Sequence, residues 1–286
     1  MTDYAINCDI ELIQELLEIS RSELSAACGI SLPTLNRWVK DPVQASAKNL
    51  ENFYSYAYNQ GLRINAIKAQ LYLQEHTNEK RKVLFHGSKS GIEGPLSIDL
   101  SRSNNDFGKG FYCGESFMQS AMFVAKFRNS SAYILTFDTR NLRAANYSVD
   151  TNWMMTIALY RKRLTSYASH PLLKELQAKV ENADYIVAPI ADNRMYEIID
   201  SFAEGYLTDE QCKHALCATD LGNQYVFKTN KALTKIKFLE HCFLCEPEKE
   251  ALVTAREASS RIGQDKVKAA KREFRGKGHY IDEVLQ

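Results

Sequence analysis

Apolar side chains near the start of the chain recur at the spacing of an amphipathic helix. The first of these apolar positions are Ile10, Leu12, Ile13, Leu16 and Leu17. Residues three or four apart share one helix face, so this spacing predicts a helix with one buried side. Helical character continues until the polar run 74–81, which predicts a domain boundary. The pattern therefore predicts an all-α domain over residues 1–78.

From residue 83 the pattern changes to short apolar runs separated by helical stretches. Strands and helices without strict alternation predict an α+β domain rather than a doubly wound sheet. We place this domain at residues 82–245. The predicted strands are 83–85, 133–137, 185–188, 224–227 and 235–244, and the predicted helices are 117–127, 153–163, 172–180, 195–202 and 209–218.

The last segment, residues 246–286, is charged and rich in alanine. It has no sizeable apolar face, which predicts a surface helix or a mobile tail. Its end is locally basic, with Arg272, Arg275, Lys277 and His279. Such a cluster is more often a solvated face than a binding site.

Within the helical domain, residues 22–38 resemble a helix-turn-helix of the phage-repressor kind. Ser20 or Ser22 can cap a helix ending at residue 28, and Gly29 interrupts it. Pro33 is tolerated in the first turn of the next helix. In such units the second helix enters the major groove of DNA. The residues expected to face DNA are Thr34, Asn36, Arg37 and Lys40.

The same two helices also suit a docking or dimerisation module. The second helix carries only two cations, Arg37 and Lys40, and Asp41 follows directly. Binding DNA by neutralising phosphates normally needs more positive charge than this. DNA binding and protein docking both remain open for this domain.

Composition narrows the possible classes of protein. The 286 residues have a formal net charge of +1, which gives no global attraction to nucleic acid or membrane. No signal peptide and no apolar stretch of membrane-spanning length is visible, and the seven cysteines suit reduced thiols. We therefore expect a cytoplasmic protein without membrane contact. The only paired cysteine spacing, Cys242 and Cys245, interrupts an apolar run, so we expect no metal site despite Cys212, His214 and Cys217 upstream.

Three short motifs carry the candidate chemistry. They are L-F-H-G-S at 84–88, D-F-G-K-G-F-Y at 106–112 and N-Q-Y-V-F at 223–227. In order and character they resemble the three NAD-contacting motifs of the ADP-ribosyltransferases, on the branch of the poly(ADP-ribose) polymerases and diphtheria toxin. The resemblance implies a split mixed β-sheet core, NAD as substrate, and cleavage of the bond between ribose and nicotinamide.

The resemblance also implies roles for individual residues. His86 would bind the adenosine ribose, and Gly87 would let its backbone approach the nicotinamide carboxamide. Tyr112 and Phe123 would form the two aromatic walls of a nicotinamide slot, where a cationic ring gains cation–π attraction. Catalytic roles fall to His86, Tyr112 and Gln224. The NAD contacts would be His86, Gly87, Ser88, Asp106, Phe107, Gly110, Tyr112, Ser120, Phe123, Asp192 and Arg194.

Gln224 is the main departure, because those enzymes often have Glu at this place. A glutamine can form hydrogen bonds there but carries no charge and takes up no proton. Either the site is weakened, or another carboxylate supplies the charge, and the candidates are Asp106, Glu115 and Asp192. Arg194 could bind a phosphate of NAD through two hydrogen bonds. A local salt bridge or helix cap explains Asp192 and Arg194 equally well.

Residues 86–244 also resemble a bacterial domain family of poorly known function, whose members share the D-F-G-K-G-F-Y run and L-G-x-Q. Within that family Gln224 is the usual residue. Such domains are often toxins or effectors beside a small partner gene. We therefore expect a mono-ADP-ribosyltransferase that modifies a macromolecule and is paired with an antitoxin. The alternatives are an NAD glycohydrolase, and a DNA-binding regulator whose second domain senses NAD.

Overall fold

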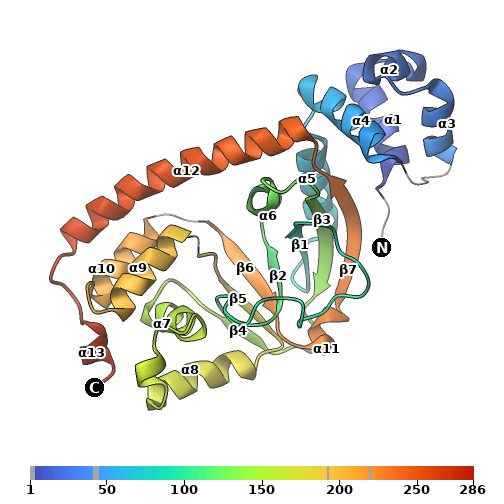
Figure 1. Cartoon of the computed structure of the whole chain (residues 1–286). Coiled ribbons are helices and arrows are strands. Elements are labelled where there is room, and N and C mark those ends of the chain that lie inside the picture. Colours follow the sequence, from blue (N-terminus) through green and yellow to red (C-terminus); the bar gives the residue numbers. More distant parts are fainter. Residues whose placement is uncertain (1–3, 41–44, 192, 219–220) are drawn as a thin grey trace. The chain divides into compact units, whose positions relative to one another are not determined.

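The computed structural model of the chain describes residues 4–40, 45–191, 193–218 and 221–286, without the side chains of residues 193 and 194. Within these residues the chain is α+β, as predicted, with a helical N-terminal region (Figure 1). It divides into two compact units. The first unit comprises residues 1–94, 116–139 and 236–256, and the second comprises 95–115, 140–235 and 257–286.

Five helices open the first unit. They are α1 (Ile6–Leu17), α2 (Arg21–Cys28), α3 (Leu32–Lys40), α4 (Ala47–Asn59) and α5 (Ile64–His76). Their buried faces meet in one core, which includes Leu24, Leu35, Trp38 and Phe53. The helical character predicted for this region is confirmed.

The turn between α2 and α3 follows the sequence signals closely. The Ser20 hydroxyl accepts a hydrogen bond from the backbone of Glu23, and the Glu23 carboxylate accepts one from the backbone of Ser20, which makes a capping box. Gly29 ends α2 with a φ of 66°, a left-handed conformation that glycine adopts without steric cost. Ser20, one of the two predicted caps, is therefore the N-cap of α2.

Three antiparallel strands complete the first unit in the order β1 (Arg81–Ser88), β3 (Ser131–Asp138) and β7 (Ile236–Phe243). Helix α6 (Phe117–Val124) and helix α5 pack against these strands around a second apolar core. This core contains Ala69 from α5 and Phe85 from β1. The N-terminal helices and the strands are thus parts of the same compact unit.

Four strands form the second unit's sheet. Their order is β4 (Ala144–Asn146), β5 (Tyr185–Pro189), β6 (Asn223–Phe227) and β2 (Phe111–Gly114). The pair β4 and β5 is parallel and the other two pairs are antiparallel, so the strands are mixed. Strand β4 was not predicted, because three residues of the type Ala-Ala-Asn carry no strand signal.

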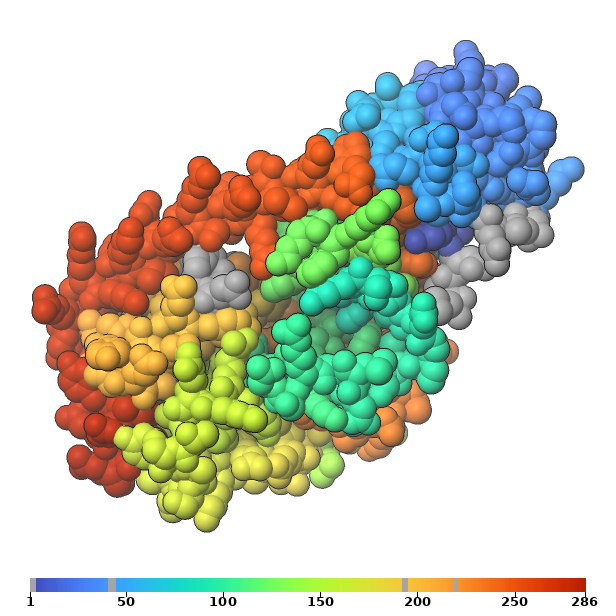
Figure 2. Space-filling view, in the orientation of Figure 1, coloured from blue at the N-terminus to red at the C-terminus, as the bar shows by residue number. Residues whose placement is uncertain are grey.

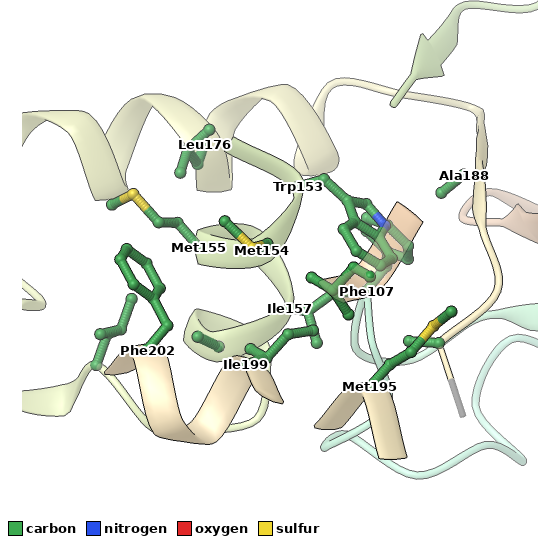
Figure 3. Packing of buried hydrophobic residues seen from close by; sticks show 14 of the residues in the cluster. Phe107, Trp153, Met154, Met155, Ile157, Leu176, Ala188, Met195, Ile199 and Phe202 are labelled. Carbon is green, nitrogen blue, oxygen red and sulfur yellow. The ribbon is translucent and has the colours of Figure 1, made fainter. Parts of the chain in front are cut away.

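Helices cover one face of these four strands. They are α7 (Thr151–Tyr160), α8 (Pro171–Glu181), α9 (Asn193–Ala203) and α10 (Asp209–Cys217), all close to the predicted helices. Trp153, Met154 and Ile157 of α7 pack with Ile199 and Phe202 of α9 in an apolar core (Figure 3). The sheet contributes Ile186, Ala188 and Val226 to this core. These three residues identify the sheet face that looks toward the helices.

The C-terminal segment is largely helical. Helix α12 (Glu246–Glu273) is preceded by the short helix α11 (Asn230–Leu233) and strand β7, and followed by α13 (Ile281–Val284). Most charged residues of α12 are exposed, whereas Glu248 and Lys249 near its start are buried. Figure 2 shows side chains projecting from the surface along this helix. Ile281 and Leu285 are buried in the core of the second unit. The last turn of the chain therefore packs, although its sequence showed no clear apolar face.

Candidate functional site

Strand β6 positions the third motif. Gln224 and Val226 lie two residues apart, so their side chains project from the same face of the strand. Tyr112 of β2 pairs directly with Val226, which places its side chain on that face as well. Val226 belongs to the core beneath α7 and α9. Gln224 and Tyr112 thus share the helix-covered face of the second unit's sheet.

Gln224 is bonded to Asp106 of the second motif. Its Nε2 donates to Asp106 Oδ2 at 3.0 Å and to the carbonyl oxygen of Pro189 at 3.1 Å. Both partners are acceptors, and Gln224 and Asp106 are only 8 % and 5 % exposed. The amide must therefore keep its NH₂ toward these two oxygens. Its oxygen, Oε1, receives no hydrogen bond from any residue that the structure describes.

The other carboxylate oxygen of Asp106 is held by two side chains. Tyr196 of α9 donates its hydroxyl to Oδ1 at 2.8 Å, and Arg161, just after α7, donates from Nη2 at 3.3 Å. The Arg161 guanidinium carbon lies 3.1 Å from the centre of the Tyr196 ring, a cation–π contact. Sequence inspection missed Arg161 and Tyr196. Neither belongs to a motif, and only the packing of α7 beside α9 brings them to Asp106.

Tyr112 closes the turn formed by the second motif. Its hydroxyl donates to the Gly108 carbonyl oxygen at 2.7 Å and accepts from the backbone N–H of Phe107 at 3.3 Å. Burial, and secondly the charge of Asp106, raises the pKa of Tyr112 above its ordinary value. Phe107 is fully buried in the helix-covered core. Tyr112 is thus a neutral phenol held in a fixed position.

Lys228 holds this turn from the end of β6. Its Nζ donates to the carbonyl oxygens of Phe107 and Lys109, on either side of Gly108. Burial lowers the pKa of Lys228 to about 8. The conformation of the second motif is therefore fixed by Tyr112 from within and by Lys228 from the third motif's strand.

Glu115, another carboxylate that the sequence offered, lies on the opposite sheet face from Gln224. It accepts hydrogen bonds from the backbone and the side chain of Asn223, at 3.3 and 3.0 Å. Asn223 and Tyr225 flank Gln224 in the strand and project away from it. Asp106 is therefore the described carboxylate that reaches Gln224. Asp192 lies outside the described residues, and so does the side chain of Arg194.

The first motif lies in the first unit, where β1 meets α6. A Cβ atom on Gly87 would lie 2.2 Å from the backbone oxygen of Ser120, so only glycine fits there. The Ser120 hydroxyl donates to the Phe85 carbonyl oxygen at 3.1 Å. Ser88 donates to the carbonyl oxygen of Gly91 at 2.7 Å. Packing between β1 and α6 thus accounts for Gly87, whose role toward a ligand stays a prediction.

His86 and Phe123 are the more accessible residues predicted in this unit. His86 is half-buried beside Tyr133, with 6.4 Å between the ring centres. Phe123 is 43 % exposed, and the Arg256 guanidinium carbon lies 5.2 Å from its ring centre. Tyr112 and Phe123 belong to different units, and the nicotinamide slot that would use both stays a prediction.

The predicted DNA contacts lie on α3. Asn36, Arg37 and Lys40 are exposed, whereas Thr34 is half-buried and shares a hydrogen bond with Ser31 at 2.8 Å. Asn36 already accepts a hydrogen bond from Arg21 of α2 at 3.1 Å. Binding of DNA by this surface stays a prediction.

The cysteines are free thiols throughout. Cys242 and Cys245 are buried, and burial raises the pKa of Cys245 to about 12. Among the described residues, no three His, Cys, Asp or Glu side chains are grouped as a metal site would require. Within the same part of the chain, no helix has both the length and the apolar character needed to cross a membrane.

The protein is thus an α+β protein in which the buried, hydrogen-bonded side chains of Asp106 and Gln224 lie on the helix-covered face of the second unit's sheet. Residues 82–238 match the family described as a protein of unknown function, DUF3990. The match covers more than half of the chain, so the protein belongs to this family. No curated protein matches the chain, and no solved structure matches it.

Proposed function

We propose that the protein is an NAD-dependent mono-ADP-ribosyltransferase. One observation carries the proposal: the third motif presents a fixed amide oxygen, Gln224 Oε1, beside the second motif's buried Asp106. A sugar hydroxyl is a donor that such an oxygen binds well. We assign to Gln224 the orientation of the ribose that carries nicotinamide.

The reaction breaks the bond between ribose C1′ and the nicotinamide nitrogen. The bonding electrons leave with nicotinamide, which departs neutral, and C1′ then bonds to an oxygen or nitrogen of the acceptor. Positive charge develops on the ribose as the bond breaks, so groups of partial negative charge lower the barrier. Gln224 Oε1 is a group of this kind in the second unit.

Gln224 takes up no proton, so the acceptor must already be nucleophilic or bring its own base. For this reason we propose single transfers rather than chain growth. The resemblance assigns the adenosine and nicotinamide contacts to His86, Tyr112 and Phe123. A toxin or effector role, restrained by a small antitoxin, is part of the same proposal.

Radiolabelled NAD incubated with the protein and a cell lysate tests the proposal. We expect label on a macromolecule together with released nicotinamide. Gln224→Leu should reduce both by about a hundredfold, the usual effect of losing one fixed hydrogen-bonding group that stabilises developing charge. Gln177→Leu is the control, because Gln177 is an exposed residue of α8 whose side chain donates a hydrogen bond to Glu181.

Two outcomes would contradict the proposal. Nicotinamide release at full rate without any labelled macromolecule would show an NAD glycohydrolase. Absence of both products, with Gln224→Leu and His86→Ala indistinguishable from the unchanged protein, would remove NAD chemistry altogether.

A further inference from the structure

We infer that Asp106 is a positioning residue that sets which end of the Gln224 amide faces the ligand. The inference rests on the proposed function, because it concerns how the same site recognises NAD. It assigns roles to Arg161 and Tyr196 as well, as the two groups that hold Asp106. The specific claim is that Asp106 keeps an acceptor, and not a donor, directed toward the substrate hydroxyl.

The first step concerns the amide itself. The two ends of a glutamine amide have nearly the same shape, so the protein must select one orientation by its hydrogen bonds. Asp106 Oδ2 and the Pro189 carbonyl oxygen both lie within 3.1 Å of Nε2, and neither can donate. Turning the amide over would place Oε1 against two other oxygens. Gln224 therefore has a single favourable orientation.

The second step concerns what holds Asp106. Its carboxylate is buried, and Oδ1 accepts from both Tyr196 and Arg161. The Arg161 guanidinium stacks on the Tyr196 ring, which restricts both side chains. Asp106 cannot rotate away from Gln224 without giving up these contacts. The donors at Oδ1 thus fix the acceptor at Oδ2.

The third step predicts what an amide at position 106 would do. In Asp106→Asn the side-chain oxygen would turn toward Arg161 and Tyr196, because both are donors. Its NH₂ group would then face Gln224, whose NH₂ already points there. Gln224 would either turn over, so that the ligand met a donor instead of an acceptor, or lose this hydrogen bond and with it part of what fixes the direction of Oε1.

Nuclear magnetic resonance of the Gln224 side-chain amide tests this without any turnover. The NH₂ signal is assigned as the one absent from Gln224→Glu. In the unchanged protein it should exchange slowly with solvent, and in Asp106→Asn it should move and exchange at least about tenfold faster, as expected for a lost hydrogen bond. Glu115→Gln makes the same chemical change on the opposite sheet face and should leave the signal in place.

NAD affinity provides the functional readout. Asp106→Asn should weaken binding by about tenfold or more, since an acceptor is replaced by a donor. Adding Gln224→Glu to Asp106→Asn supplies an acceptor at each end of the new carboxylate, one for the NH₂ introduced at position 106 and one for the ligand. The double variant should therefore recover part of the affinity, less than all because its inner oxygen faces Pro189. A purely structural role for Asp106 predicts no such rescue.

The outcomes separate this inference from the proposed function. If the amide signal responds as stated but neither the unchanged protein nor any variant binds NAD, the positioning role stands and the proposed function fails. If NAD is turned over while Asp106→Asn changes neither the Gln224 signal nor NAD affinity, the positioning role is overturned. Should Asp106→Asn fail to fold, Tyr196→Phe removes only one hydroxyl from Oδ1, and an unchanged signal with unchanged affinity in that variant overturns the inference equally.

Discussion

At the scale of single residues, Lys68 of the first unit is a buried cation placed between two buried carboxylates. Its ammonium nitrogen lies 2.9 Å from Asp9 Oδ2 and 3.1 Å from Glu240 Oε1, and all three residues are buried. Burial lowers the pKa of Lys68, but the carboxylates, Asp9 foremost, outweigh it and raise the pKa above its ordinary value. Helix α1, helix α5 and strand β7 therefore meet at one buried ionic cluster, which contains Asp9, Lys68 and Glu240.

Lys68→Met should destabilise the protein severely, because it leaves two buried carboxylates without a cation. Removing one partner of a buried ion pair typically costs about 3–5 kcal/mol. The measurement is the free energy of unfolding from a urea titration. Lys48→Met serves as the control, since Lys48 is exposed on α4 and should tolerate the change. Equal stability of the two variants would show that Lys68 is not needed to compensate these charges.

Glu248 should make the stability of the first unit fall as pH rises. Burial raises its pKa from 4.5 to about 7, although Asn65 donates a hydrogen bond to it at 2.8 Å. A carboxyl with a higher pKa in the folded chain binds its proton more tightly there, so its contribution is complete below pH 4.5 and is lost as pH rises through 7. Glu248→Gln should therefore be more stable than the unchanged protein at pH 8, by on the order of 2–3 kcal/mol.

The two proteins should have similar stability at about pH 5, where Glu248 is protonated in the folded chain. Urea titrations at both pH values measure this difference directly, and comparison between the proteins cancels the other titrating groups. A stability difference that is the same at both pH values would mean that Glu248 does not titrate in this window.

At the scale of elements, sequence patterns predicted most helices of the second unit well, although α7 buries six consecutive residues, 153–158, rather than one face. Helices α7 to α10 all lie within a few residues of their predicted bounds. Strand β4 was missed because a three-residue strand depends on its neighbour β5 rather than on its own composition. The same limit applies to the candidate site. The motif residues Asp106 and Gln224 could be selected from sequence, whereas Arg161 and Tyr196 required the packing of two helices.

The cap of α2 provides a prediction at this scale. Ser20→Ala removes the side chain that accepts from the Glu23 backbone, and loss of such a cap typically costs about 1 kcal/mol. Amide hydrogen exchange in α2 should therefore become faster by several fold, with exchange in α4 unchanged. Ser22→Ala is the control for the neighbouring hydroxyl, which shares a hydrogen bond with that of Ser20 at 2.9 Å but is not the N-cap of the helix. Equal effects of the two substitutions would mean that the capping box does not stabilise α2.

At the scale of the whole molecule, the first unit draws on three separate stretches of sequence. Its N-terminal helices share it with β1, β3 and β7, and α5 contributes Ala69 to the core against the sheet. Asn65 of α5 also donates to the Phe243 carbonyl oxygen at 2.8 Å. Contacts of this kind join residues more than 170 positions apart in sequence. Helices 1–78 are therefore held by interactions that a cut in the chain does not remove.

A protease site introduced in the exposed residues 77–80 should demonstrate this. After cleavage we expect the two fragments to elute together from a size-exclusion column under native conditions, because the Lys68 cluster and the α5 core still join them. Cleaved Lys68→Met should separate far more readily, since Glu240 would then face Asp9 without a cation between them. If the cleaved protein that retains Lys68 instead separated into two folded fragments, the helical region would be an independent domain, as a detachable DNA-binding module would be.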